Sequence, residues 1–486
     1  MKIALVIAPF EFNERFGMPF PIGVGYLATV LDKAGHQVKI IDCYTMKVSL
    51  NNLRSYLLTE RPDLVGLNCT SYSRFSAIKI IKMAKQTLPN AYLVAGGPHF
   101  TATADDALKN VSEIDVIVRG EGERTILDLV RAIENGEGLK EIEGISFRNN
   151  GNIQHNRDRE LIKDLDSLPI LKRDFLENKF YLERLPHSNI LCKSVVASRG
   201  CPFNCSFCFQ HEKSYRRRTT DNILQEVSCL LEKYQIEAIR FFDLSFTVSR
   251  NSVEDFCNQI IRRKLKFKWY CESRVDIDLK LLELMKEAGC YSLDFGLESA
   301  SPRVLKLINK AIIPEQALAF AKKCKELDIK TKAFFMISLP GEQKEDAEQT
   351  FNFAYQLSKY VNALGVSVTN IIPGSELEQR ARQLNILASD FSWNSPIDYK
   401  KTTVFMKTEP VPLYIEKLKL SQIWHFYRKY SIFETFELKN LRISFLGKKA
   451  YNALTKWDKG IRFKVNWVFM FLKYGASRLL GRSRRQ

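Results

Sequence analysis

The sequence predicts an α/β protein with two successive sheets: an N-terminal Rossmann-like, doubly wound parallel sheet, and then a partial TIM barrel. Continuous apolar runs alternate with helical runs over residues 1–148 and again over 191–390. Such alternation is typical of parallel sheets that are covered by helices. The chain has 486 residues, too many for one ordinary core. After about Asp390 the strand pattern stops, so residues 391–486 are expected to form a helical C-terminal region.

The first series of elements occupies residues 1–148. The expected strands are 2–9, 36–42, 62–69, 91–97, 115–120 and 144–149, and the expected helices between them are 23–35, 50–60, 75–88 and 123–136. Ligands of such sheets bind beyond the carboxyl ends of the strands. Three of these ends carry Asn68–Ser73, Gly96–His99 and Gly120–Glu123. Their glycines would let a ligand approach the backbone, although plain tight turns explain them equally well.

A polar, irregular stretch, 149–190, is expected to be a linker to the second series in 191–390. There the expected strands are 194–198, 238–245, 267–274, 291–299, 332–340 and 364–373, and the expected helices are 221–234, 252–264, 278–289, 301–310, 314–327 and 345–360. Six such units predict a barrel or partial barrel, whose active site lies at the C-terminal ends of the strands.

Three cysteines follow the first strand of this second series, in the stretch SRGCPFNCSFCFQ: Cys201, Cys205 and Cys208. Three thiolates can hold three irons of a 4Fe–4S cluster and leave the fourth iron open to a substrate or cofactor. The alternative is a zinc site completed by His211, because structural zinc has four protein ligands. The spacing of the cysteines, the aromatic Phe207 before the last of them, and the barrel-like series that follows weigh against zinc.

The other cysteines suggest a reducing compartment. Eight are scattered singly among apolar neighbours and are expected to be buried, inert thiols: Cys43, Cys69, Cys192, Cys229, Cys257, Cys271, Cys290 and Cys324. The N-terminal MKIALVIAPF is expected to be a strand rather than a signal peptide, and no apolar run is long enough to span a bilayer. A cytoplasmic protein is therefore expected.

The cysteine motif CPFNCSFC resembles the signature of radical S-adenosylmethionine (SAM) enzymes. The downstream segments FFDLSFT, WYCESRVD, FGLESASPRVLKLINK, FMISLPGE and IIPGSEL resemble further strand-end motifs of that superfamily. The segments PDLVGLNC, VAGGPHFTA and VIVRGEGERT resemble the cobalamin-binding domain that precedes the barrel in one subgroup. The resemblance covers about residues 1–385 and says little about the substrate.

This resemblance implies a 4Fe–4S cluster on Cys201, Cys205 and Cys208, with SAM bound at the open iron. Phe207 would lie against the adenine of SAM. The residues implied to hold its amino group or ribose are Asp243, Ser245 and Glu298. Arg274 is expected either to contact SAM or to form a buried ion pair. For Asp243 and Glu298 the alternative is a structural hydrogen bond or salt bridge. Acidic side chains suit such a pocket because ammonium and hydroxyl donors need acceptors there.

For cobalamin, the resemblance implies a site at Thr70, Ser71, Gly96, Gly97, Pro98, Gly120 and Glu121. Domains of the methionine-synthase type carry a cobalt-binding histidine after the first strand, but the loop PFEFNERFGMPFP has none. We therefore expect base-off cobalamin without a histidine ligand. His99 is expected to be a structural histidine of its loop. Thr70 and Ser71 are equally compatible with ordinary loop hydroxyls.

The resemblance implies an enzyme that reductively cleaves SAM to a 5′-deoxyadenosyl radical, with electrons from a flavodoxin or ferredoxin type of donor. Methylation of an unactivated carbon is the expected reaction. Radical cyclisation, ring contraction or oxidation would use the same cofactors. A cobalamin sensor or an Fe–S electron carrier is the alternative from another class, but a carrier needs no second ligand at five further strand ends, and a sensor needs no open iron.

The C-terminal tail is strongly basic. Residues 438–486 contain thirteen Lys or Arg and one acid, which accounts for +12 of the net charge of +18, together with eight aromatic residues. An amphipathic helix of this kind could lie on an anionic membrane at the inner face, which would favour a hydrophobic or lipid substrate. A helix packed on the barrel is the alternative. Nucleic acid is not expected, because no recognition motif accompanies the charge. The basic run KSYRRRTT is expected to be a solvated or phosphate-facing loop.

Overall fold

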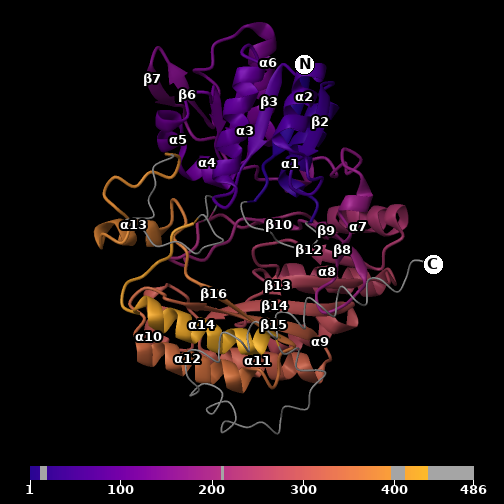
Figure 1. Cartoon of the computed structure of the whole chain (residues 1–486). Coiled ribbons are helices and arrows are strands. Elements are labelled where there is room, and N and C mark those ends of the chain that lie inside the picture. The colour runs from indigo at the N-terminus through magenta and orange to yellow at the C-terminus, as the bar shows by residue number, and fades with distance from the viewer. Residues whose placement is uncertain (11–18, 210–212, 396–410, 436–486) are drawn as a thin grey trace, which may run out of the picture. The chain divides into compact units, whose positions relative to one another are not determined.

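The computed structural model describes residues 1–10, 19–209, 213–395 and 411–435 (Figure 1). The predicted tail helix in 438–486 and the alternative ligand His211 lie outside the described residues, as does most of the loop that follows the first strand. In the described part of the chain, no helix is both long and apolar enough to cross a membrane.

Sheet A forms the N-terminal part and has seven strands in the order β2-β1-β3-β4-β5-β6-β7 (Figure 1). Its first five strands are parallel and the last two are antiparallel. The strands are β1 (Lys2–Ile7), β2 (Gln37–Asp42), β3 (Leu64–Asn68), β4 (Tyr92–Gly96), β5 (Val116–Val118), β6 (Ile145–Asn149) and β7 (Asn152–His155). The strand order reverses at β1, and in open α/β sheets this switch point is where ligands bind.

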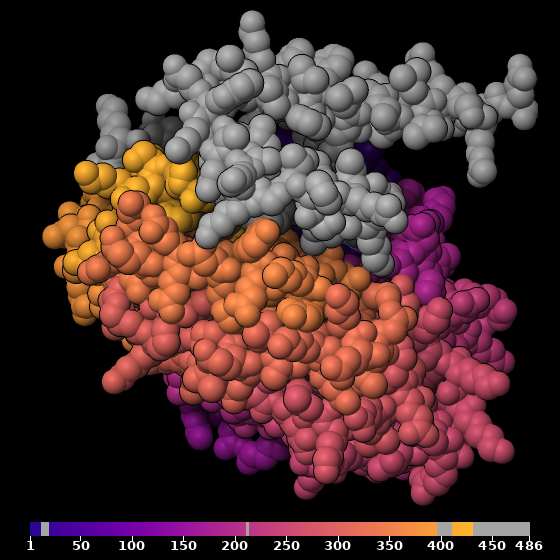
Figure 2. Space-filling view, turned by 90° about the horizontal axis from the view of Figure 1, so that it is seen from below, coloured from indigo at the N-terminus to yellow at the C-terminus, as the bar shows by residue number. Residues whose placement is uncertain are grey.

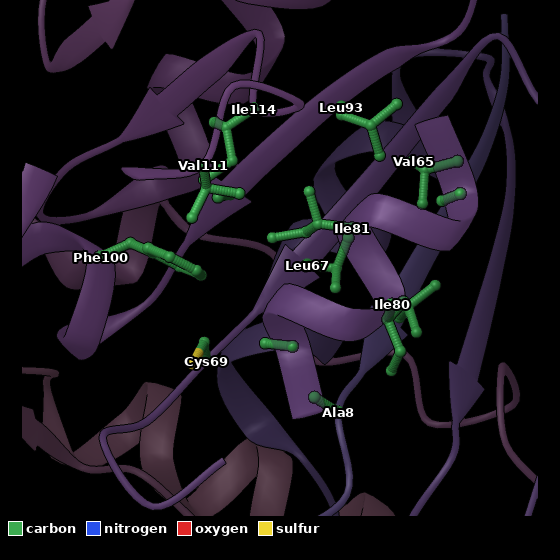
Figure 3. Packing of buried hydrophobic residues seen from close by; sticks show 14 of the residues in the cluster. Ala8, Val65, Leu67, Cys69, Ile80, Ile81, Leu93, Phe100, Val111 and Ile114 are labelled. Carbon is green, nitrogen blue, oxygen red and sulfur yellow. The ribbon is translucent and has the colours of Figure 1, made fainter. Parts of the chain in front are cut away.

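Helices cover both faces of sheet A: α1 (Ile22–Lys33), α2 (Leu50–Glu60), α3 (Arg74–Thr87), α4 (Pro98–Ala102), α5 (Ala104–Asn110) and α6 (Gly122–Asn135). Alternate residues of β3 supply two cores. Val65 and Leu67 pack with Ile80 and Ile81 of α3 (Figure 3), whereas Leu64 packs in the core under α1 and α6. Sequence reasoning missed α4, α5 and β7, because runs this short have too few residues to show a period.

The stretch 149–190 contributes β7 to sheet A. It also contributes Leu171, Leu176 and Tyr181 to the core under α1 and α6. The hydroxyl of Tyr181 donates a hydrogen bond to Asp42 Oδ2 (2.7 Å) at the end of β2. Much of the expected linker is therefore held on sheet A.

Sheet B forms the second part, in the order β16-β15-β14-β13-β12-β9-β8. Six of its strands are parallel, and β8 joins antiparallel at the edge. The strands are β8 (Glu183–Arg184), β9 (Leu191–Val195), β12 (Ala238–Phe241), β13 (Lys268–Ser273), β14 (Cys290–Glu298), β15 (Lys330–Ile337) and β16 (Ala363–Val368). No pairing closes the sheet among the described residues, so the predicted partial barrel and α/β fold class are confirmed.

One face of sheet B is covered by helices, which are α7 (Thr220–Tyr234), α8 (Arg250–Arg262), α9 (Leu279–Glu287), α10 (Pro302–Leu307), α11 (Pro314–Glu326) and α12 (Lys344–Leu357). Phe241 and Trp269 pack edge to face against Phe256 of α8. Residues 391–435 include α14 (Leu420–Thr435), which follows α13 (Glu376–Gln383). Tyr430 of α14 contacts Phe335 and Phe351, and Figure 2 shows α14 in yellow beside the orange part of the chain.

Seven of the eight scattered cysteines are buried, as predicted, but Cys229 on α7 is exposed. No disulfide is formed among the described cysteines.

Candidate active site

A cavity of about 720 Å³ lies at the carboxyl ends of β1, β3, β4 and β5. Six of the seven residues predicted to bind cobalamin line it: Thr70, Gly96, Gly97, Pro98, Gly120 and Glu121. The cavity is also lined by residues next to the cysteine loop, namely Ser198, Arg199 and Gly200, and by Phe242 and Leu244 beyond β12. The strand ends of sheet A and the cysteine loop therefore face a common space.

Gly97 shapes one wall of this cavity. Its φ is +90°, and a Cβ there would lie 2.9 Å from both Asn68 Nδ2 and the Cys69 carbonyl oxygen. Only glycine fits this position, because both the left-handed backbone and the close neighbours exclude a side chain. The turn leaves bare backbone facing the cavity, as a bulky ligand between β3 and β4 requires.

Replacing Gly97 by alanine is expected to lower stability by roughly 1–3 kcal/mol and to weaken cobalamin binding, because the backbone of the loop must move to relieve the clash. Gly35→Ala is the matched control. Gly35 has a φ of +89°, but nothing lies within 4 Å of its Cβ position. A spectrophotometric cobalamin titration of both variants, alongside thermal unfolding, separates backbone strain from loss of the site. Equal cobalamin affinity in the two variants would contradict this role of Gly97.

Ser71, the seventh predicted residue, does not line the cavity. Its hydroxyl lies 3.0 Å from Nδ1 of His99, and Nε2 of His99 lies 3.2 Å from Asn394 Oδ1. Burial, and after it the charge of Arg74, lowers the pKa of His99 to about 3. His99 is thus a neutral, hydrogen-bonded core residue, in agreement with the structural role expected for it.

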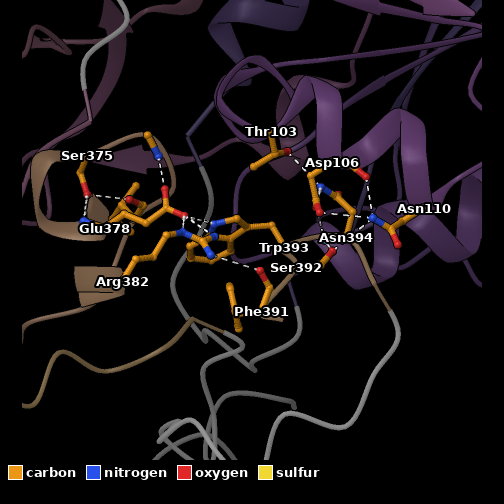
Figure 4. A network of polar contacts seen from close by, with 12 residues as sticks. Thr103, Asp106, Asn110, Ser375, Glu378, Arg382, Phe391, Ser392, Trp393 and Asn394 are labelled. Atoms are coloured by element: carbon orange, nitrogen blue, oxygen red, sulfur yellow. Dashed lines mark hydrogen bonds and ion pairs between the residues drawn. The ribbon is translucent and has the colours of Figure 1, made fainter. Parts of the chain in front are cut away.

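Residues 391–395 lie along α4 and α5 and connect to α13 through a polar network (Figure 4). Asn394 donates from its side chain to Thr103 Oγ1 (3.1 Å) and to Asp106 Oδ2 (2.9 Å). Trp393 donates from its indole to Glu378 Oε1 of α13 (2.8 Å). Through the contact between Asn394 and His99, this segment is joined to the Gly96–His99 turn.

The three motif cysteines lie in one loop, between β10 (Ser198–Arg199) and β11 (Arg216–Arg217). Cys201 is buried, whereas Cys205 and Cys208 are half-buried, and the amide of Cys208 donates to the Cys205 carbonyl (3.1 Å). Among the described residues, no three His, Cys, Asp or Glu side chains converge closely enough to hold a metal ion. The structure thus places the thiols in one turn without bringing them together at a single point.

The surroundings of this loop suit an iron–sulfur cluster. Burial raises the pKa of the Cys205 thiol, and the positive charges of Lys310 and Arg274 act in the opposite direction. Nearby cations favour the thiolate, which is the form that binds a metal. The donor set of three thiols in a partly buried turn therefore fits the group that the motif implies.

Glu298 ends β14 with a φ of +67°, a strained position for a residue other than glycine. Its carboxylate forms an ion pair with Lys310 Nζ (2.8 Å), and both side chains are largely buried. The pair lies over Gly296, where a Cβ would stand 2.1 Å from Glu298 Oε1 and 3.0 Å from Lys310 Nζ. Strain of this kind at a strand end is typical of functional sites. Lys310 was missed by sequence reasoning.

Arg274 pairs with Asp276 (2.7 Å), and its guanidinium lies 3.8 Å from the ring centroid of Phe203 in the cysteine loop. Of the two readings left open for Arg274, the structure contains the ion pair. Phe207 packs on a cluster that includes Ile371, Leu377 and Tyr72, so its ring lies beside the IIPGSEL segment.

Asp243 accepts hydrogen bonds from the Ser198 hydroxyl and from the amide of Ala197 (3.3 Å). Burial raises its pKa, and these hydrogen bonds oppose the change. Asp243 therefore fixes the strand that leads into the cysteine loop. The buried hydroxyl of Ser245 has no hydrogen-bond partner among the described residues, so it remains available to a bound ligand.

In the basic run KSYRRRTT, Lys213 is exposed, but the expectation of a solvated or phosphate-facing loop was wrong for Arg216, Arg217 and Arg218. Arg216 pairs with Glu121 (2.8 Å) and Arg218 with Glu226 (2.6 Å), and all four side chains are largely buried. The Arg217 guanidinium lies 4.4 Å from the ring centroid of Phe246. Guanidinium groups tolerate such burial because they form several hydrogen bonds and stack on rings.

Glu121 connects the cavity to the cysteine loop. Arg199, which directly precedes Gly200 and Cys201, pairs with both Glu121 (2.7 Å) and Glu123 (2.6 Å), and Arg216 pairs with the other oxygen of Glu121. Burial opposes ionisation of Glu121, but the hydrogen bonds from Arg216 and Arg199 outweigh it and lower its pKa. Sequence reasoning identified Glu121 but not its partners. Their only sequence signal is their position on either side of the cysteine motif.

Comparison with known proteins agrees with this geometry. The B12 binding domain matches residues 13–130, and the radical SAM superfamily matches residues 195–354. An uncharacterized methyltransferase of Pyrococcus horikoshii is 34% identical over 80% of this chain and 84% of its own length. The anaerobic magnesium-protoporphyrin IX monomethyl ester cyclase of Rubrivivax gelatinosus is 31% identical over 69% of this chain and 61% of its own length.

A solved structure has a similar fold. The radical SAM methyltransferase TsrM from Kitasatospora setae, determined with cobalamin and a 4Fe–4S cluster, superposes with a TM-score of 0.71 and 17% identity, over 87% of this chain and 90% of that one. The chain is thus an enzyme of the radical SAM superfamily. It belongs to the group that carries an N-terminal cobalamin-binding domain, and its cofactors are a 4Fe–4S cluster, SAM and cobalamin.

Proposed function

We propose that this enzyme transfers a methyl group to an unactivated carbon of a hydrophobic substrate. The observation that carries the proposal is a cavity lined both by the strand ends proposed to bind cobalamin and by residues next to the cysteine loop. When bound, the cofactors supply one-electron cleavage of SAM and a transferable methyl group. A common space is what such a reaction needs, because the groups that exchange hydrogen and methyl must lie near the same carbon.

Different residues are proposed to bind the cluster and SAM. Cys201, Cys205 and Cys208 would bind the cluster. The residues proposed to hold SAM are Phe207 against the adenine, with Asp243, Ser245, Arg274 and Glu298 around the remaining polar groups. Support for this assignment is the free hydroxyl of Ser245 and the Glu298–Lys310 pair, which offers one acceptor and one donor to a zwitterionic amino acid.

Apolar side chains support a hydrophobic substrate. Phe242 and Leu244 leave 50% and 61% of their surface exposed although they line the cavity. Large exposed apolar groups in a cavity wall favour a ligand that covers them. A lipid or another hydrophobic molecule would suit this wall. Contact of residues 438–486 with the inner face of the membrane remains part of the proposal, as does a flavodoxin or ferredoxin type of donor in the cytoplasm.

A second candidate reaction is cobalamin-assisted cyclisation or oxidation. The similarity to a protoporphyrin monomethyl ester cyclase favours it, because that relative is named for ring formation and not for methyl transfer. Ring contraction would use the same site. Methyl transfer is preferred, since a relative that is similar to this chain over 84% of its own length is named an uncharacterized methyltransferase.

The test is anaerobic reconstitution with iron, sulfide and cobalamin, followed by mass spectrometry of the SAM products under reducing conditions. S-adenosylhomocysteine together with 5′-deoxyadenosine is expected for methyl transfer. 5′-Deoxyadenosine alone would favour the second candidate. Absence of both products from a fully loaded enzyme would contradict either reaction and favour a sensor or an electron carrier.

A further inference from the structure

Arg240 stands out on β12 because its guanidinium makes no direct ion pair or hydrogen bond with any residue in the described part of the chain. Its Nε is buried without a partner among these residues, although the residue as a whole is half-buried. The unpaired guanidinium can therefore accept an anionic ligand. Its two contacts are aromatic: the guanidinium carbon lies 5.2 Å from the Phe242 ring centroid and 5.3 Å from that of Tyr270.

The alternation of side chains along β12 shows on which face of sheet B Arg240 lies. Ile239 and Phe241, its neighbours in sequence, are fully buried, and Phe241 packs against Phe256 of α8 on the helix-covered face. Successive side chains point to opposite faces of a sheet, so Arg240 belongs to the face without helices. Phe242 and Leu244 continue on that same side and line the cavity.

Arg240, Phe242 and Leu244 thus form a row of side chains, here called the track, which is charged at one end and apolar at the other. At about 3.3 Å per residue, Arg240 and Leu244 are up to roughly 13 Å apart along an extended chain. One end of the track carries an unpaired cation between two rings, and the other end carries exposed apolar surface at the wall of the cavity. A molecule that matches it has an oxyanion at one end and an apolar body reaching toward the cofactors.

An acid on the neighbouring strand makes no ion pair with Arg240. The charge of Arg240 acts to lower the pKa of Glu272 on β13, but the two side chains form no ion pair. Burial first, and then the charge of Asp294, raises the pKa of Glu272 above its ordinary value. The hydroxyl of Tyr270 is directed to the acids, 3.2 Å from Asp294 Oδ2 and 3.5 Å from Glu272 Oε1. The acids therefore have a partner of their own, and the guanidinium remains open to an incoming anion.

We propose that Arg240 is a substrate-binding residue that holds the oxyanion, phosphate or carboxylate, of an amphiphilic substrate whose apolar part lies over Phe242 and Leu244. The proposal rests on the proposed function, because it assigns the substrate class of the same site. Guanidinium suits this role, since it binds both oxyanions in a bidentate manner.

The test measures binding of octyl phosphate, octanoate, octanol and inorganic phosphate to the reconstituted holoenzyme by calorimetry. The expected result is that octyl phosphate or octanoate binds at least about tenfold more tightly than octanol or inorganic phosphate, and the two anions differ according to which oxyanion the site prefers. Arg240→Gln should remove this preference, and Arg240→Lys should retain part of it. Leu244→Ser should weaken the binding of both octyl anions while leaving the binding of inorganic phosphate unchanged.

Arg157→Gln is the matched control, because Arg157 is 77% exposed and lies in the N-terminal part of the chain. If Arg240→Gln binds octyl phosphate and octanoate as the wild type does, the proposal is wrong. SAM products measured without any octyl compound test the proposed function separately. If the enzyme transfers methyl groups but Arg240→Gln keeps the preference for octyl anions, only this inference is overturned. If the anions bind as expected but no methyl transfer occurs, only the proposed function is overturned.

Discussion

Replacing Cys205 by alanine is expected to abolish reductive SAM cleavage while leaving cobalamin binding intact. Three thiolates hold three irons, so loss of one leaves the cluster with too few protein ligands. The loss should exceed the roughly 100-fold that removal of an outer-shell partner typically costs at a metal site. The measurement is iron and sulfide content after anaerobic reconstitution, together with 5′-deoxyadenosine by mass spectrometry.

Cys229→Ala is the matched control for this variant, because Cys229 is a free, exposed cysteine on α7, far in sequence from the motif. It should keep full iron content and full SAM cleavage. Cys201→Ala and Cys208→Ala should behave as Cys205→Ala does. A chain that lacks any one of these three thiols but still cleaves SAM would show that the cluster is held elsewhere.

The cysteine motif could be found in the sequence because its information is local. Cys201, Cys205 and Cys208 are close together in the chain, and their spacing, with Phe207 and the barrel-like series that follows, favours a cluster with an open iron over zinc. Gly96 and Gly97 could also be predicted as site residues from local sequence. Continuous apolar strands indicate a parallel sheet, and ligands of such a sheet bind at the carboxyl ends of its strands. Both predictions use only short stretches, and the structure places both stretches beside one cavity.

Pairings between distant segments could not be predicted. Lys310 and Glu298 are twelve residues apart, and Arg199 reaches Glu121 across 78 residues. In the sequence, KSYRRRTT is simply a basic run, and charge runs are usually solvated. Arg216 is buried because β10 pairs with β11 and brings Arg216 to Glu121, a consequence of tertiary folding alone. Arg240 was hidden for the same reason, since its lack of a partner is visible only in three dimensions.

The second variant with a large expected effect is Glu121→Gln. The carboxylate of Glu121 pairs with Arg199 and Arg216, which lie on the two strands that flank the cysteine loop, while Glu121 itself and the glycines on either side of it line the cavity. Glu121→Gln keeps the shape but removes the charge, so two buried guanidiniums lose a shared anion. Breaking a buried pair from one side typically costs roughly 3–5 kcal/mol. We expect the lower end, because Arg199 retains Glu123.

The control for Glu121→Gln is Glu160→Gln, where a 69% exposed carboxylate pairs with Lys163. Surface pairs of this kind contribute about 0–1 kcal/mol. Denaturant unfolding of the two variants and of the wild type gives the difference in the free energy of unfolding, and cobalamin and iron content report whether the cavity and the cluster loop are both affected. Equal stability of the two variants would contradict a structural role of the pair.

The pH dependence gives an independent check of the same ion pairs. The folded-state pKa of Glu121 lies below its ordinary value of 4.5, so the stabilisation is fully present above that pH and is lost as the pH falls through the folded-state pKa. The stability gap between wild type and Glu121→Gln should therefore be constant near neutral pH and should narrow only below about pH 4.5. A gap that stays the same in acid would show that the variant perturbs packing rather than charge. A narrowing gap, with cobalamin and cluster content falling together in the variant, would identify Glu121 as the residue through which the cavity and the cysteine loop hold each other in place.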